Sequence, residues 1–331
     1  MNGKSVVAER DTPAGSLAGV RIAVIGLGSM GFGMAASLIR GGADVVGYDP
    51  AEAALARLVA QGGTRAASPA QAARGASIVF CVVVNADQTE AVLFGPEGCA
   101  EAMAAGGIFV SCATMAPDRA RALAGRLTAR GRRYLDAPIS GGSKRAAEGA
   151  LTVLASGPAD VFEDAAPALD AVSATLYRLG DQPGQAAAFK MVNQLLAGVH
   201  IAAASEAMAF AAREGLDLAR VYEVITKSAG NSWMFENRMP HVLDGDYSPH
   251  SAISIFVKDL GIVMDMARGS SFPVPMAGAA LQMFLMTAAA GMGADDDASV
   301  ARLYAQMAGL KLPGMANGDA DAGGTSGGAR T

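Results

Sequence analysis

The sequence predicts an α/β protein: a doubly wound parallel sheet followed by an all-α domain, with a long interdomain helix joining the two. Three observations support this prediction. Short apolar strands alternate with helices up to about residue 180, and a glycine-rich turn follows the first strand. From Pro183 onward strand signals disappear, and Ala, Leu and Met dominate. Strands separated by helices are typical of parallel sheets covered by helices.

The composition bears on the compartment of the protein and argues against several classes of partner. The 331 residues, 51% of them hydrophobic, suffice for two domains with large cores. The net charge of -5 and the absence of a basic run argue against nucleic-acid and membrane-surface partners. No charge-free apolar run reaches membrane length, and the N-terminus lacks a signal-peptide core. Three cysteines without a CxxC pair fit a reduced cytoplasm, so we expect a cytoplasmic protein.

The alternating pattern gives an element order. Apolar runs predict strands at 21–25, 44–48, 77–84, 107–111, 132–135, 151–156 and 175–179. Helices are predicted at 32–42, 51–61, 69–73, 87–93, 97–105, 117–129 and 160–171, and beyond the interdomain helix at 218–228, 231–238, 254–268, 275–290 and 296–309. We expect a flexible tail at 1–18, a cofactor domain at 19–181, a helical domain at 182–312 that includes an interdomain helix at 183–213, and a disordered tail at 313–331.

The turn after the first strand carries the clearest ligand signal. It reads Gly26, Leu27, Gly28, Ser29, Met30, Gly31, which is a GxGxxG pattern that opens a helix. Glycines let the backbone approach a pyrophosphate, and the helix N-terminus attracts its charge. Asp49 ends the next strand, where a carboxylate accepts hydrogen bonds from ribose hydroxyls and repels the 2′-phosphate of NADP. We therefore predict a Rossmann-type domain that binds NAD.

Other turns follow the carboxyl ends of the predicted strands, where ligands bind in such sheets. They contain Val84 and Asn85, then Thr114, and then the segment from Asp136 to Gly142. Thr114 and Ser140 alone are also ordinary cap or turn residues.

The predicted interdomain helix contains a polar group in an apolar setting. Its apolar positions run most of the way round, which is typical of a helix packed on several sides. Lys190 is unusual there, because burying a lysine is costly unless it is paired or neutralised. A lysine that snorkels to water is the alternative interpretation.

Four sequence blocks, in order, resemble the β-hydroxyacid dehydrogenase family, which is related to 3-hydroxyisobutyrate and 6-phosphogluconate dehydrogenases. They are GLGSMGFGMAASL, DAPISGG, GQAAAFKMVNQ and FVKDLG, and the resemblance covers residues 20–310. Within the family, the segments NSWMFENR and HVLDGDYSPH look most like L-threonate dehydrogenases. Tartronate semialdehyde reductase and 3-hydroxyisobutyrate dehydrogenase remain alternatives.

The resemblance implies hydride transfer between NAD and a hydroxy acid. Lys190 would be the general acid/base, and Thr114 and Lys258 would contact the cofactor, as would Val84 and Asn85. The residues implied to bind substrate are Ser140, Gly141, Gly142, Arg145, Asn193, Gln194 and Trp233. Trp233 is as well explained by core packing. A homo-oligomer, dimer or tetramer, is expected.

Two residues depart from the family pattern, and a third differs in the cofactor signature. Gln194 stands where many relatives have Asn, and Arg145 follows Lys144 where relatives often have Gly. The added positive charge suits a carboxylate substrate. Ser37 stands where many relatives have Asn.

Competing functions are weaker. His241, Asp244, Asp246 and His250 could bind a metal, but their spacing matches no standard site, so we expect none. A Ser–His–Asp hydrolase lacks its GxSxG turn. A non-catalytic cofactor-binding module is disfavoured by Lys190.

Overall fold

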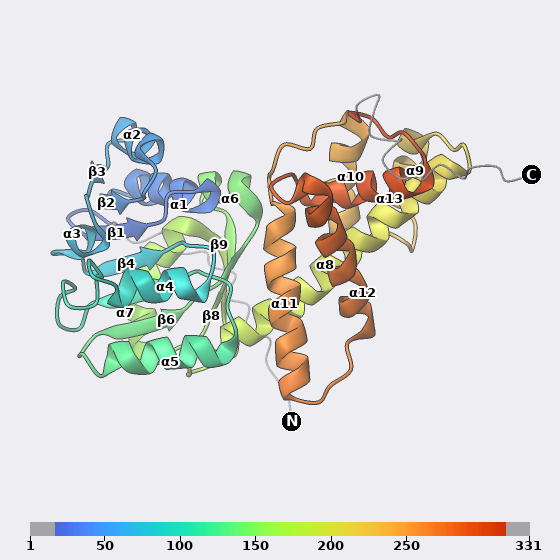
Figure 1. Ribbon diagram of the computed structural model, residues 1–331. Coiled ribbons are helices and arrows are strands. Elements are labelled where there is room, and N and C mark those ends of the chain that lie inside the picture. Colours follow the sequence, from blue (N-terminus) through green and yellow to red (C-terminus); the bar gives the residue numbers. More distant parts are fainter. Residues whose placement is uncertain (1–16, 316–331) are drawn as a thin grey trace, which may run out of the picture. The chain divides into compact units, whose positions relative to one another are not determined.

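The computed structural model describes residues 17–315 and divides the chain into two units (Figure 1). The first unit ends at Met191 and the second begins at Val192. The division therefore falls inside helix α8 (Gln185–Arg213), ten residues beyond the expected boundary. The expected tails, apart from the few residues at 17–18 and 313–315, lie outside the described residues.

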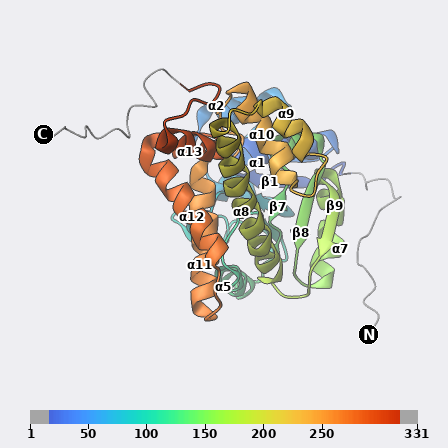
Figure 2. The same cartoon turned by 90° about the vertical axis from the view of Figure 1, so that its right-hand side faces the viewer.

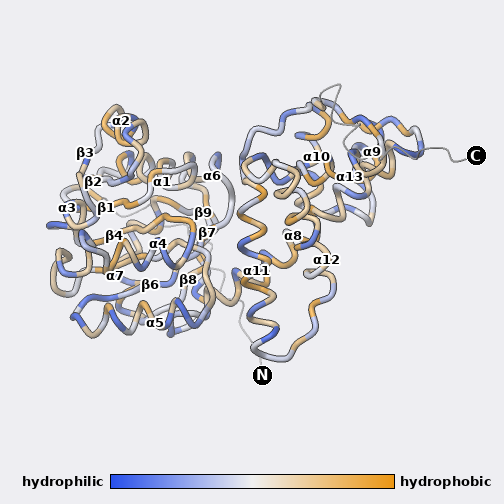
Figure 3. Tube along the Cα trace, in the orientation of Figure 1, coloured by the Kyte–Doolittle hydropathy of each residue, from blue (hydrophilic) through white to orange (hydrophobic). Residues whose placement is uncertain are grey.

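The main sheet of the first unit has six parallel strands in the order β3-β2-β1-β4-β5-β6. The strands are β1 (Arg21–Ile25), β2 (Asp44–Tyr48), β3 (Thr64–Arg65), β4 (Ile78–Cys81), β5 (Ile108–Ser111) and β6 (Arg133–Asp136). Successive residues of β1 and β4 enter opposite core clusters, since side chains alternate between the faces of a sheet. Both faces are therefore buried, as in other parallel sheets, and β4 and the part of β1 after Arg21 are hydrophobic (Figure 3).

A second sheet, of three strands, follows the first along the chain. It contains β7 (Ile139–Ser140), β8 (Leu151–Ala155) and β9 (Ser173–Arg178). β7 runs antiparallel to β8, whereas β8 and β9 are parallel. The strands expected at 151–156 and 175–179 thus form a sheet of their own, and β7 was not expected. Figure 2 shows β8 and β9 with α7 (Ala159–Val172) beside them.

Seven helices of the first unit connect these strands. They are α1 (Ser29–Arg40), α2 (Glu52–Ala60), α3 (Pro69–Ala73), α4 (Ala86–Phe94), α5 (Pro117–Thr128), α6 (Gly142–Glu148) and α7. Helix α6 was not expected. The helix predicted at 97–105 is wrong: the chain turns back after α4, where Cys99 N and Ala100 N donate to Val92 O and Leu93 O. Gly98 permits this turn, because a Cβ there would lie 2.4 Å from Leu93 O.

The second unit is helical, as expected. It contains the rest of α8, then α9 (Leu218–Ile225), α10 (Trp233–Asp244), α11 (Ile253–Gly269), α12 (Pro275–Thr287) and α13 (Val300–Ala308). A short π-helix (Ala288–Met292) extends α12, and a 3₁₀ turn (Asp297–Ser299) precedes α13. Helices α11 and α12 run side by side (Figure 2), with the rings of Phe256 and Phe284 stacked at 5.1 Å between centroids.

Within residues 17–315, two helices are long and apolar enough to cross a membrane by length and mean hydropathy alone. They are α8 and the segment Pro275–Met292. The sequence expectation, which counted only charge-free runs, did not identify them. Both make core contacts: the first turn of α8 is hydrogen-bonded to buried groups of the first unit, and Phe284 is fully buried. Of the most apolar window of each segment, 44% is buried in α8 and 28% in Pro275–Met292, and length with hydropathy is weak evidence for a membrane span.

Candidate active site

The glycine-rich turn after β1 is shaped for close backbone approach. A Cβ at Gly31 would lie 1.9 Å from Gly26 O, and one at Gly26 would lie 2.5 Å from Val82 O. Gly28 faces open space and caps α1 without a side-chain hydrogen bond, and no acidic residue stands in the first turn. The turn therefore leaves room at a helix N-terminus for the pyrophosphate of a dinucleotide, and its residues fit that group.

Asp49 lies beside this turn, as predicted. Its Oδ2 accepts a hydrogen bond from Leu27 N at 2.7 Å, and its Oδ1 accepts one from Ala51 N at 2.8 Å. The carboxylate thus holds the glycine-rich turn against the end of β2, and each oxygen keeps a lone pair for a ribose hydroxyl.

Arg57 is a neighbour of the turn that sequence reasoning missed. Its guanidinium donates to Leu27 O at 3.4 Å and lies 4.6 Å from the centroid of the Phe32 ring. The sequence argument for NAD considered only the residues directly after Asp49 and found no positive charge there. A local pattern does not indicate that a side chain in the middle of α2 turns back to this loop.

The other predicted cofactor residues follow β4 and β5 at the same edge of the sheet. Val84 is 46% exposed, which leaves it accessible to a ligand. Asn85 caps α4, and its Oδ1 accepts from Gln88 N at 2.9 Å. Thr114 is partly buried just after β5. Their contact with the cofactor stays a prediction.

The Ser140–Gly142 segment joins β7 to α6. Gly141 and Gly142 have φ angles of 137° and 78°, which favour glycine. A Cβ at Gly142 would meet nothing within 4 Å, so its backbone is open to a ligand. Arg145 is exposed, and its Cδ lies 3.0 Å from where a Cβ of Gly141 would be.

Helix α1 packs closely on α6 and links the two predicted binding segments. Gly33 allows this approach, because a Cβ there would lie 2.6 Å from Ala147 N. Ser37, one of the residues that depart from the family pattern, donates from its Oγ to Ala146 O at 3.1 Å. The cofactor turn and the Ser140–Gly142 segment are therefore held in one rigid arrangement.

Lys190 is buried, with 6% of its surface exposed, so it does not snorkel to water. Its Nζ donates a hydrogen bond to Ile139 O at 2.9 Å. Since Ile139 directly precedes Ser140, the structure brings the predicted acid/base group and the predicted carboxylate-binding segment together within the first unit.

Two buried groups that we did not predict hold the start of α8. Asp136 Oδ2 accepts from Gly184 N at 2.8 Å and Ala187 N at 3.0 Å. Ser156 Oγ accepts from Ala186 N at 2.9 Å and donates to Asp136. Burial raises the pKa of Asp136 to about 6, against the opposing effect of these backbone hydrogen bonds. In the sequence, Asp136 could have been identified as a site residue because it is the first residue of the DAPISGG block.

The second unit brings together another set of predicted residues. Asn193 Nδ2 donates to Gln194 Oε1 at 2.9 Å, and Gln194 Nε2 donates to Asp259 Oδ2 at 2.5 Å. Lys258 pairs with the other oxygen of Asp259. Asp259 is 1% exposed and was not among the predicted site residues, although it links all of them. In the sequence, Asp259 could have been identified as a site residue because it follows Lys258 in FVKDLG.

Trp233 is the first residue of α10, and 54% of its surface is exposed. The core-packing alternative for this tryptophan is therefore wrong. An exposed indole is free to contact a ligand, and that contact stays a prediction.

Two family models match the chain. The NAD binding domain of 6-phosphogluconate dehydrogenase matches residues 21–180, and the NAD-binding domain of NADP-dependent 3-hydroxyisobutyrate dehydrogenase matches residues 184–304. An L-threonate dehydrogenase of Cupriavidus necator is 52% identical over 295 residues, covering 89% of this chain and 98% of the relative. This chain belongs to the β-hydroxyacid dehydrogenase family.

Further relatives agree with this assignment. An L-threonate dehydrogenase of Escherichia coli K12 is 46% identical and covers 88% of this chain and 96% of the relative. A crystal structure of a 3-hydroxyisobutyrate dehydrogenase from Salmonella typhimurium has a TM-score of 0.82 at 47% identity, covering 86% of this chain and 99% of that one. The protein is an NAD-dependent dehydrogenase of this family that acts on a hydroxyl group.

Proposed function

We propose that this enzyme oxidises L-threonate to 2-dehydro-L-erythronate with NAD, and that Lys190 is the general acid/base. Five relatives at 46–52% identity carry the name L-threonate dehydrogenase, which supports the substrate. The observation that supports the role of Lys190 is its burial, with Nζ on Ile139 O beside the Ser140–Gly142 segment.

The proposed reaction needs a group that takes the hydroxyl proton and groups that bind the substrate carboxylate, and we assign both to residues of the first unit. When bound, NAD accepts the hydride from the carbon that carries the hydroxyl. Lys190 takes the hydroxyl proton on its Nζ during oxidation and returns it during reduction. Ser140 and the backbone N–H groups of Gly141 and Gly142 bind the substrate carboxylate, and Arg145 adds positive charge beside them.

The second unit supplies the remaining predicted contacts. Asn193 and Gln194 bind substrate oxygens through their amides, and Gln194 is oriented by its bond to Asp259. We assign Lys258 to cofactor binding, as we do Thr114, Val84 and Asn85 of the first unit. Trp233 covers the bound substrate, which its exposure permits.

A substrate panel tests the proposal. L-Threonate, D-glycerate and 3-hydroxyisobutyrate are compared by absorbance of the reduced cofactor, and L-threonate should have the highest kcat/KM. The name of the Salmonella typhimurium structure favours 3-hydroxyisobutyrate as the second candidate, with tartronate semialdehyde reduction as a third. A higher kcat/KM for 3-hydroxyisobutyrate or tartronate semialdehyde would overturn L-threonate as the assigned substrate but not the oxidoreductase chemistry. The absence of turnover with every acid would favour a non-catalytic module.

We also propose a cytoplasmic homo-oligomer, a dimer or tetramer. Val192, Leu196 and Phe210 lie on one face of α8 and are 63%, 49% and 66% exposed. An apolar stripe of this length on a helix favours a protein–protein contact, and a second copy of the chain is the partner we propose. The three buried, unpaired cysteines support a reducing compartment.

A further inference from the structure

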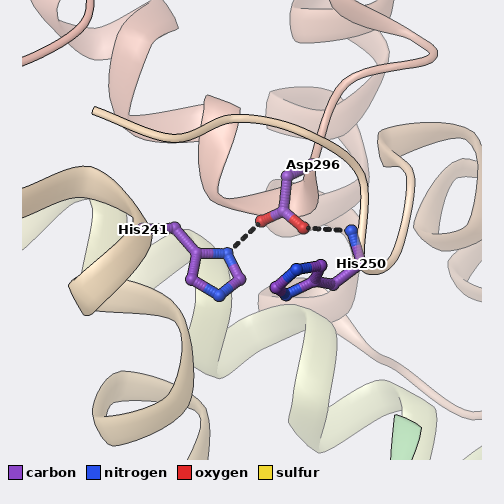
Figure 4. Close-up of side chains that lie close together, drawn as sticks. All are labelled: His241, His250 and Asp296. Atoms are coloured by element: carbon purple, nitrogen blue, oxygen red, sulfur yellow. Dashed lines mark hydrogen bonds and ion pairs between the residues drawn. The ribbon is translucent and has the colours of Figure 1, made fainter. Parts of the chain in front are cut away.

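Two histidines and an aspartate, none of which has been assigned a role above, meet in the second unit (Figure 4). His241 lies in α10, His250 lies in the loop before α11, and Asp296 directly precedes the 3₁₀ turn. His241 Nδ1 is 2.9 Å from Asp296 Oδ1, and the two imidazole rings stand nearly perpendicular, 4.7 Å apart between centroids. Three chain segments thus converge on one point.

We propose that His241, His250 and Asp296 bind one divalent transition-metal ion. Each residue offers one ligand atom, and these atoms lie within 4.8 Å of one another. Ligands at about 2.0–2.1 Å from a common ion are roughly 3 Å apart at right angles and slightly more in a tetrahedron. His241 and Asp296 already have this spacing, and His250 is exposed and can rotate inward.

The carboxylate is held in place independently of the imidazoles. Asp296 Oδ1 also accepts from Ala298 N at 3.1 Å, and Oδ2 accepts from His250 N at 2.9 Å and Ser251 N at 3.4 Å. Asp296 is fully buried, whereas the side chain of His241 is 16% exposed. Backbone donors of this kind orient a ligating carboxylate, and the exposed His250 provides an entry path.

The local charge and ligand chemistry indicate the class of ion. Three carboxylates lie around the imidazoles (Asp296, Asp297 and Asp246), against one guanidinium, that of Arg238. Two imidazoles with one carboxylate suit Zn²⁺, Co²⁺ or Ni²⁺, whereas Mg²⁺ and Ca²⁺ prefer oxygen ligands. The bound ion connects α10, the following loop and the segment before α13, so it stabilises the second unit by mass action.

The test uses the full-length protein without an affinity tag, freed of metal with a chelator. Zn²⁺ is titrated by calorimetry, Co²⁺ binding is followed by visible absorption, and the thermal midpoint is measured with and without Zn²⁺. His250→Ala removes an exposed ligand and should leave the metal-free midpoint unchanged. His200→Ala is the matched control, because His200 is the third histidine of the chain and is not among the clustered ligands.

We expect one Zn²⁺ per chain, a higher thermal midpoint with Zn²⁺, and at least about a tenfold loss of affinity in His250→Ala. His200→Ala should bind like the wild type. Three results would each overturn the proposal: the absence of saturable binding, equal affinity in wild type and His250→Ala, or an equal loss in His200→Ala. None of these depends on the substrate, so the outcome is separate from that of the proposed function.

Discussion

The side-chain nitrogen of Lys190 lies 2.9 Å from the backbone oxygen of Ile139 and donates a hydrogen bond to it. This bond connects the start of α8 to the strand that precedes the Ser140–Gly142 segment. The bonds from Gly184 N and Ala187 N to Asp136 fix the beginning of α8, one turn before Lys190. The first unit therefore holds the Lys190 Nζ beside the Ser140–Gly142 segment.

Replacing Lys190 by Ala should reduce turnover by roughly 10²–10⁴, the usual contribution of a general acid/base. NAD affinity should change little, because the Lys190 Nζ donates its hydrogen bond to Ile139 O, beside the segment assigned to the substrate carboxylate. Steady-state kinetics and cofactor titration measure the two quantities. Lys227→Ala, at an exposed position, is the control. Retention of more than half of the wild-type turnover would rule out the assigned role.

Asp136→Asn should change how stability depends on pH. Burial raises the pKa of Asp136 to about 6, above the ordinary value of 3.8, so the folded state binds the proton more tightly than the unfolded state. The resulting stabilisation is present below about pH 4 and is lost as pH rises through about 6. At about 1.4 kcal/mol per pKa unit, wild type should lose roughly 3 kcal/mol relative to Asp136→Asn over that window.

Denaturant unfolding of both proteins between pH 4 and pH 7.5 measures this difference. Ser156→Ala keeps the carboxylate but removes a hydrogen bond that lowers its pKa, so the stability of this variant should depend on pH at least as strongly as that of the wild type. If the difference between wild type and Asp136→Asn were the same at every pH, the raised pKa of Asp136 would be wrong.

NAD should be preferred over NADP by roughly a hundredfold in kcat/KM. The Asp49 carboxylate and the 2′-phosphate of NADP, a few ångströms apart, repel by about 2–3 kcal/mol. Since about 1.4 kcal/mol changes a binding constant tenfold, this repulsion corresponds to the expected preference. Asp49→Ser should reduce the preference for NAD, chiefly by strengthening the binding of NADP. Arg57→Ala is the companion variant, since Arg57 contacts the same turn. Parity of the two cofactors in the wild type would mean that Asp49 does not face the ribose.

His241→Gln tests the buried pair with Asp296, in a buffer that contains a chelator. The hydrogen bond with Asp296 raises the pKa of His241 above its ordinary value of 6.5, more than burial lowers it. The stabilisation is therefore complete below about pH 6.5 and is lost as pH rises through the folded pKa. The stability difference between wild type and variant should shrink above that range in denaturant unfolding. A stability difference that grew with pH would contradict the interaction between His241 and Asp296.

Leu196→Glu should weaken self-association, because it places a charge in the exposed apolar stripe of α8. Sedimentation or light scattering should report a smaller species with unchanged secondary structure by circular dichroism. Glu206→Lys is the charge control on the same helix. If the wild type were a monomer, there would be no contact between copies. If Leu196→Glu left the oligomer intact, the contact would lie elsewhere.

Local patterns in the sequence were sufficient for the main sheet and the cofactor turn. Five of the strands of the main sheet were expected from apolar runs, because a strand buried on both faces is a continuous apolar run that neighbouring residues alone define. The GxGxxG turn needed only its place between a strand and a helix. The four blocks that indicated the family are also contiguous, and the comparisons confirmed them.

Tertiary structure decided what depends on distant residues meeting. Asp136 and Ala187 are 51 positions apart, and His241 and Asp296 are 55 apart. The sequence hypothesis for a metal cluster used Asp244 and Asp246, which are close to His241 along the chain, whereas the fold supplies Asp296. The wrong helix at 97–105 has the same origin, since a chain reversal held by Gly98 outweighed the local helix propensity. Periodicity reports which face of an element is apolar, but the path of the chain determines which side chains converge.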